Sequence, residues 1–118
     1  MKRLIIMYGL LGAGTTATAA DDIGMIETGK RVFQHVCAPC HGAGPGLDGS
    51  KMLPGTAVLA DRYKGVVPAP LEQRPGLTYD FLIQVVRHGQ GAMPMFRKTE
   101  ITDAEVKALA LYLMNKSN

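Results

Sequence analysis

Two cysteines and a histidine lie within five consecutive residues of this chain, in the run Cys37-Ala38-Pro39-Cys40-His41. Two thiols separated by two residues can add across the two vinyl groups of a porphyrin, and the histidine that follows is placed to bind the iron through a ring nitrogen. A C-x-x-C-H run is the attachment signature of covalent haem. The motif predicts one covalent haem, with thioethers at Cys37 and Cys40 and with His41 as the proximal iron ligand.

Three other roles for the cysteine pair fit the sequence less well. A disulfide across two residues closes too small a loop to stabilise a fold much. Cys-Ala-Pro-Cys resembles a thioredoxin-type redox pair, but that fold needs a strand–helix–strand pattern, and the chain has no convincing strands. A zinc site would need further ligands, and the chain has only these 2 cysteines.

A second iron ligand is predicted in the stretch Gly91-Ala92-Met93-Pro94-Met95-Phe96. A thioether sulfur is a soft ligand that suits an iron centre which stays six-coordinate during electron transfer. Met93 precedes Pro94, which holds it in an extended conformation. Met95 has the same chemistry and, two residues further along an extended segment, faces the same side. The residues by themselves leave both Met93 and Met95 as candidates.

Three main helices are expected to position these groups. Apolar or small residues recur at helical spacing from Ile26 to Cys37. A second helix is predicted over 78–89, where Thr78 can cap the start and Gly89 can end it, although alternating apolar residues leave a strand as the competitor. The C-terminal helix begins at a capping box made by Thr102 and Glu105.

The segment between the first two helices is expected to be irregular. Residues 41–77 contain seven glycines and five prolines and show no sustained period. The chain has 118 residues, with 47% hydrophobic residues and 6% aromatic ones, so it forms one small domain with few aromatic side chains for its core. A buried porphyrin would supply a large apolar body for this segment to wrap around.

The N-terminus has the three parts of a secretory signal peptide. Lys2 and Arg3 are followed by a short apolar run and by the small residues Ala17-Thr18-Ala19. This pattern predicts a signal peptide over 1–19, cut after Ala19 or Ala20, with an uncleaved anchor as the alternative. The apolar run is too short to span a bilayer as a helix. We therefore expect residues 20–118 to be exported, to a bacterial periplasm, without stable membrane insertion.

Removal of the predicted signal peptide also removes the main support for predicting nucleic-acid binding. The formal net charge of +3 comes from 13 Lys+Arg and 10 Asp+Glu. Without Lys2 and Arg3 the net charge is +1, and the remaining basic residues are spread along the chain. No nucleic-acid partner is expected.

Over essentially the whole mature chain, the sequence resembles a class I cytochrome c. The matching positions lie on both terminal helices, in the haem motif and in a Met-Pro-x-Phe loop: Gly29, Phe33, Cys37, Cys40, His41, Met93, Pro94, Phe96, Leu109 and Tyr112. The resemblance implies an all-α, small cytochrome c fold over 20–118, with three main helices and long loops around one haem c. It implies that Leu109 and Tyr112 of the C-terminal helix pack across the N-terminal helix at Gly29 and Phe33. It also implies that Met93, rather than Met95, is the distal iron ligand.

The resemblance suggests further contacts for the haem. The family has a proline whose carbonyl accepts the other imidazole N–H. Pro45 comes early in this sequence, and Pro54, which sits nearer the usual spacing, is the preferred candidate. Arg62, Tyr63 and Lys64 are candidates to bind the propionates. A narrower resemblance, to the cytochrome subunits of flavocytochromes such as p-cresol methylhydroxylase, lies in the Arg-x-Gly-x-x-x-Met-Pro-x-Phe pattern that begins at Arg87.

These features predict a periplasmic monohaem cytochrome that carries single electrons between redox partner proteins and transforms no substrate by itself. One alternative is a cytochrome subunit that accepts electrons from the flavoprotein subunit of a dehydrogenase. The other is a haem protein with an open sixth site that binds or senses small ligands.

Overall fold

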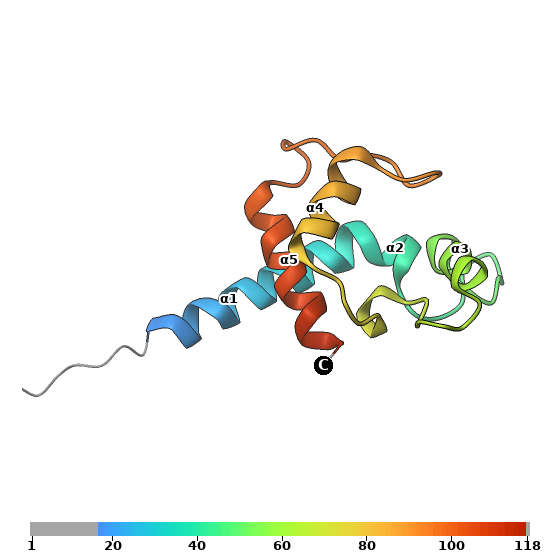
Figure 1. Ribbon diagram of the computed structural model, residues 1–118, viewed down its shortest axis with the longest axis horizontal. Helices are drawn as coiled ribbons and strands as arrows, with labels where there is room; N and C mark the ends of the chain where they lie inside the picture. The colour runs from blue at the N-terminus through green and yellow to red at the C-terminus, as the bar shows by residue number, and fades with distance from the viewer. Residues whose placement is uncertain (1–16, 118) are drawn as a thin grey trace, which may run out of the picture.

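The computed structural model describes residues 17–117, and Figure 1 shows their arrangement. Within these residues the regular elements are all helical, and one isolated bridge between Gln90 and Met93 is the only β-type pairing. The elements, in chain order, are α1 (Ala17–Val32), the π-helical turn η1 (Phe33–Cys37), α2 (Ala38–His41), α3 (Pro54–Tyr63), the 3₁₀ turn η2 (Leu71–Gln73), α4 (Tyr79–His88) and α5 (Asp103–Lys116). The predicted all-α fold is confirmed, while the predicted signal peptide lies mostly outside the described residues.

The crossing of α1 and α5 forms the centre of the fold (Figure 1). A Cβ added at Gly29 would lie 2.0 Å from the Ala108 carbonyl oxygen, so only glycine allows the two backbones to approach this closely. One turn further on, the rings of Phe33 and Tyr112 pack with centroids 5.8 Å apart. The terminal-helix contact implied by the family resemblance is therefore present.

The second predicted helix is confirmed as α4, and its ends explain why it is not a strand. The Thr78 side chain accepts a hydrogen bond from the Phe81 N–H, and Gly89 stops the helix at φ +68°. Leu82 and Val86 on its inner face are buried in the core. The capping box of α5 is also confirmed, because the backbone N–H groups of Thr102 and Glu105 each bond to the other residue's side chain.

The segment 41–77 is more regular than predicted, because it contains α3 and η2. Pro54 stands in the first turn of α3, where a proline ring fits and a missing N–H costs nothing. At the other end Lys64 takes a left-handed conformation, with φ 47°, and its N–H bonds to the Ala60 carbonyl. Pro54 and Gly55, which were among the residues that suggested a loop, in fact begin a helix.

The buried apolar side chains come from a limited part of the chain. They lie in η1, α4 and α5 and in the residues that precede α4 and α5: Phe33, Leu77, Leu82, Val86, Ile101, Val106, Ala108, Leu109, Ala110, Tyr112 and Leu113. Residues 34–76 contribute none. The α2–α3 part of the molecule therefore has little apolar core made by its own side chains.

In the described part of the chain, no helix combines the length and the apolar character needed to cross a bilayer.

Candidate functional site

The predicted thioether cysteines lie where the first helical segment changes its winding. Cys37 is the last residue of η1, whose wide turn closes with a bond from the Ala38 N–H to the Phe33 carbonyl. Cys40 follows in the four-residue helix α2. A π-helical turn shifts the helical register by one residue and is frequent at functional sites. The turn therefore sets the direction of the attachment motif relative to the face of α1 that packs on α5.

The two thiols have different surroundings, and both are free cysteines. Cys37 is half-buried at the edge of the core, whereas Cys40 is exposed. Burial, followed by the neighbouring Cys40, raises the pKa of the Cys37 thiol to about 11, so this thiol is protonated at neutral pH.

The His41 ring is enclosed on its Nδ1 side by the first turn of α3. A Cβ added at Gly55 would lie 2.7 Å from His41 Cε1 and 2.8 Å from Nδ1, so glycine is needed for this contact. Nδ1 is buried and has no hydrogen-bond partner. Burial lowers the pKa of the imidazole, which favours the neutral ring that binds metals.

The expected hydrogen bond from His41 to the Pro54 carbonyl is not formed. Pro54 instead begins α3, where its carbonyl takes part in the bonding of the first helical turn. The prediction was correct that the segment around Pro54 faces the His41 ring, but the predicted hydrogen bond to the Pro54 carbonyl was wrong.

Thr56 fastens α3 to the attachment motif and was missed by the sequence analysis. Its side chain is buried, and its Oγ1 donates to the Gly42 carbonyl at 2.8 Å and lies 3.4 Å from the Cys40 carbonyl. These contacts connect residues that are 14 and 16 positions apart in the sequence, so no local sequence pattern predicts them.

The two candidate methionines differ in their exposure. Met93 is half-buried and exchanges two backbone hydrogen bonds with Gln90, at 3.0 and 3.1 Å. Met95 is 60% exposed. Gly89 lies against the Met93 carbonyl, where a Cβ would come within 2.6 Å. The loop after α4 is therefore tightly folded, and it extends toward the end of the molecule at which α2 and α3 lie (Figure 1).

Two of the predicted propionate partners, Arg62 and Tyr63, form a small cluster with Arg74. The Arg74 guanidinium lies 4.1 Å from the centroid of the Tyr63 ring, and that of Arg62 lies 6.0 Å from it. Lys64 forms an exposed ion pair with Asp61. Arg74 was not among the predicted residues, because the loop between α3 and η2 separates it from Tyr63 in sequence.

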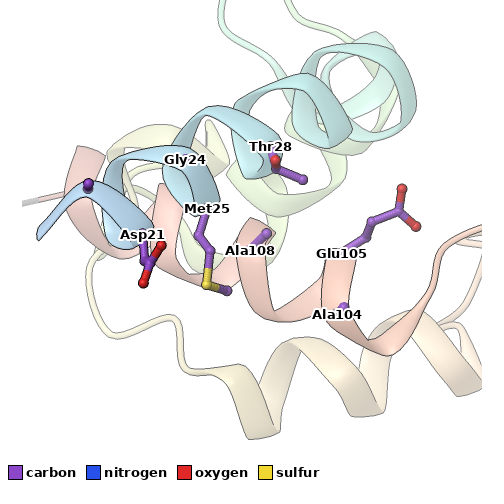
Figure 2. Close-up of a pocket in the computed structure, with 8 residues that line it drawn as sticks. Asp21, Gly24, Met25, Thr28, Ala104, Glu105 and Ala108 are labelled. Carbon is purple, nitrogen blue, oxygen red and sulfur yellow. The ribbon is translucent and has the colours of Figure 1, made fainter. Parts of the chain in front are cut away.

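A groove between α1 and the start of α5 lies apart from these residues. Figure 2 shows Met25 and Thr28 of α1 facing Glu105 and Ala108 of α5 across it. None of the residues predicted to hold a haem lines this groove. Nor do three or more His, Cys, Asp or Glu side chains between residues 17 and 117 gather into a metal-binding cluster.

Comparison with known proteins shows to which family the chain belongs. Residues 24–113 match the model of the family described as cytochrome c oxidase, cbb3-type, subunit III. Cytochrome c6 of Leptolyngbya boryana is 31% identical over 90 residues, which cover 75% of this chain and 89% of that protein. Cytochrome c6 of Synechocystis is 32% identical over 115 residues, which cover 97% of this chain and 81% of that protein.

The chain belongs to this family and is a class I c-type cytochrome. It is similar as well to the cbb3-type cytochrome c oxidase subunit CcoP of Azospirillum, at 33% identity over 100 residues, which cover 81% of this chain but 30% of that protein. No solved structure gives a significant match. The cytochrome is a monohaem electron-transfer protein and not an enzyme, and its cofactor is covalently bound haem c.

The residues around α2 fit this cofactor. They comprise two free thiols at the required spacing and a histidine whose pKa is lowered by burial. The buried His41 Nδ1 is the ring nitrogen turned into the protein, and Gly55 leaves room for the ring.

Proposed function

We propose that this cytochrome is an exported, periplasmic carrier of single electrons whose haem is attached at Cys37 and Cys40 and ligated by His41 and Met93. The observation that carries the proposal is the His41 ring directly after the two free thiols, packed against Gly55 with its Nδ1 buried, beside the bond from Thr56 to the Gly42 carbonyl. When bound, haem iron supplies the one-electron exchange between its ferrous and ferric states. The chain's residues hold the ligands in place.

The choice of Met93 is supported by its surroundings. Met93 is half-buried, and its N–H and its carbonyl both bond to Gln90, which restricts its backbone. Pro94, the next residue, restricts the backbone further. Met95 is exposed and lacks these restraints. A neutral thioether opposite an imidazole favours the reduced state and raises the reduction potential.

The ligand set is tested by comparing Met93→Ala with its matched control, Met95→Ala, in the holoprotein. We expect Met93→Ala to lose the far-red absorption band of methionine-ligated ferric haem, to have a lower reduction potential and to bind carbon monoxide readily when reduced. Met95→Ala should behave as the unmodified protein. The opposite result would make Met95 the ligand, and carbon monoxide binding by the unmodified protein would favour the open sixth site.

The exported location rests on the pattern of residues 1–19 and is tested by expression in a bacterium. We expect the periplasmic fraction to contain holoprotein that begins at Ala20 or Asp21, as measured by intact mass. Haem-loaded protein that retains residue 1 and stays with the membrane would instead show an uncleaved anchor.

A role as an enzyme subunit is the second candidate. It is favoured by the 33% identity to CcoP, which is named as a subunit of an oxidase, and by the pattern at Arg87 that resembles flavocytochrome subunits. Purification from the native source distinguishes the two roles. A monomer supports the diffusing carrier, whereas a stoichiometric flavoprotein or oxidase partner supports the subunit.

A further inference from the structure

Arg87 is a mostly buried cation in the last turn of α4. Its side chain is 14% exposed, so its charge needs partners inside the protein. Asp103 at the start of α5 supplies one, with its Oδ1 at 2.6 Å from Nη2 and 3.2 Å from Nε. Lys98 lies 2.8 Å from the other oxygen of this carboxylate. Lys98, followed by Arg87, lowers the pKa of Asp103, which therefore stays ionised at neutral pH.

The same guanidinium also binds the chain that follows the Met-Pro loop. Nη1 donates to the Phe96 carbonyl at 3.0 Å, and Nη2 donates to the Ile101 carbonyl at 2.8 Å. The Phe96 N–H donates to the Val86 carbonyl at 2.7 Å. Both backbone groups of Phe96, three residues after Met93, are thus tied to the last turn of α4.

The other end of this loop is fixed at the same turn. Gly89 ends α4 with φ +68°, and its Cα lies so close to the chain at Met93–Met95 that a Cβ would meet three backbone atoms within 3.1 Å. Gln90 and Met93 close the loop through two backbone bonds. The segment that carries Met93 is therefore a short loop with both ends fastened beside Arg87.

We propose that Arg87 is a positioning residue, which holds the 89–96 loop closed so that the Met93 thioether stays on the haem iron in both oxidation states. This inference rests on the proposed function, in which Met93 is the distal ligand. Arg87 acts through the Phe96 and Ile101 carbonyls, and planar donors in a fixed fork suit two carbonyls and a carboxylate at once. A lysine ammonium could keep the ion pair with Asp103 but could not reproduce this fork.

The test compares Arg87→Gln and Arg87→Lys with Arg97→Gln in the holoprotein. Arg97 is a matched control, because it follows the same loop but is exposed, and within residues 17–117 its side chain pairs only with Glu100. We expect Arg87→Gln to weaken the methionine band of the ferric protein. Carbon monoxide association with the reduced protein should become about tenfold faster, the factor that corresponds to losing one charged hydrogen bond. In both the methionine band and the carbon monoxide rate, Arg87→Lys should lie between Arg87→Gln and the unmodified protein. Arg97→Gln should match the unmodified protein.

A folded Arg87→Gln holoprotein with an unchanged band and an unchanged carbon monoxide rate would overturn the inference. If Arg87→Gln does not fold, Arg87→Lys decides by the same two readouts, since it retains the charge. Met93→Ala is measured in parallel. If it keeps the band, the proposed ligand fails and the role of Arg87 fails with it. If it loses the band while the Arg87 variants keep it, only the inference about Arg87 is wrong.

Discussion

Each residue of the candidate site has a distinct physical environment. Cys37 is half-buried and protonated at neutral pH, Cys40 is exposed, and the His41 ring is enclosed by Gly55. Haem addition needs both thiols near the porphyrin edge, and iron binding needs a neutral ring nitrogen. Attachment and ligation therefore depend on separate side chains and can be tested separately.

Removing both thiols should abolish covalent attachment. We expect Cys37→Ser with Cys40→Ser to yield protein from which acidic acetone extracts all haem, whereas each single variant keeps one thioether. Intact mass after extraction measures the outcome. Covalent haem on the double variant would contradict the assigned attachment residues.

The contact between the Tyr112 hydroxyl and the Glu72 carboxylate provides a pH-dependent test of stability. The hydroxyl donates to the carboxylate, and burial, together with this carboxylate, raises the pKa of Tyr112 from 10.0 to about 12. A raised pKa means that the folded state holds the proton more tightly. The stabilisation is therefore complete below pH 10 and is lost as the pH rises through about 12.

Chemical denaturation of the holoprotein between pH 9 and pH 12 measures this effect. We expect the advantage in unfolding free energy over Tyr112→Phe to shrink across that range. A constant difference between the protein and Tyr112→Phe would show that folding does not raise the pKa of Tyr112.

At the scale of elements, the crossing of α1 and α5 depends on glycine at one position. Gly29 lies against the Ala108 carbonyl and the Tyr112 side chain, whereas a Cβ at Gly24, on the same helix, would meet no atom within 4 Å. Alanine normally stabilises a helix interior relative to glycine. The two glycines should therefore respond to the same substitution with opposite signs.

We expect Gly29→Ala to lower the free energy of unfolding by about 3 kcal/mol, because the two helices must separate to admit the Cβ. Gly24→Ala should raise it by up to about 1 kcal/mol. Thermal or urea unfolding of the two holoproteins measures both values. Equal effects would mean that the close helix contact does not determine stability.

The ends of these elements were predictable from sequence because their signals are local. Thr78 and Gly89 delimit α4 within a dozen residues, and Thr102 and Glu105 form the capping box of α5 across one turn. The attachment motif is likewise a run of five residues.

Contacts between distant segments were not predictable in the same way. Thr56 bonds across 14 residues, Arg87 reaches Asp103 across 16, and α3 lies within a segment whose prolines and glycines indicated a loop. Such contacts follow from the tertiary arrangement and leave no periodic pattern in the chain. The pairing of Gly29 and Phe33 with α5 was foreseen only through the family resemblance.

At the scale of the whole molecule, the core is unevenly distributed. The buried apolar side chains lie in η1 and in or just before α4 and α5, while residues 34–76 contribute none. The α2–α3 part is connected by polar contacts such as that of Thr56 with Gly42. A covalent haem would supply the apolar body for this part of the molecule.

Loss of haem should therefore unfold the molecule unevenly. In the Cys37→Ser, Cys40→Ser variant freed of haem, we expect amide hydrogen exchange to accelerate most over residues 38–76, and least at the crossing of α1 and α5. Peptide-resolved exchange of the variant and the holoprotein measures this pattern. A uniform loss of protection would contradict the division of the molecule into these two parts.

The central claim is that this cytochrome carries one electron on a haem whose sixth position is closed by a thioether. A potentiometric titration of the holoprotein, followed by haem absorbance under nitrogen and then under carbon monoxide, tests it most directly. We predict one transition with a one-electron slope and the same midpoint under both gases. A midpoint that rises under carbon monoxide would mean that the gas binds the reduced iron, and this result, or a slope other than one electron, would contradict the claim.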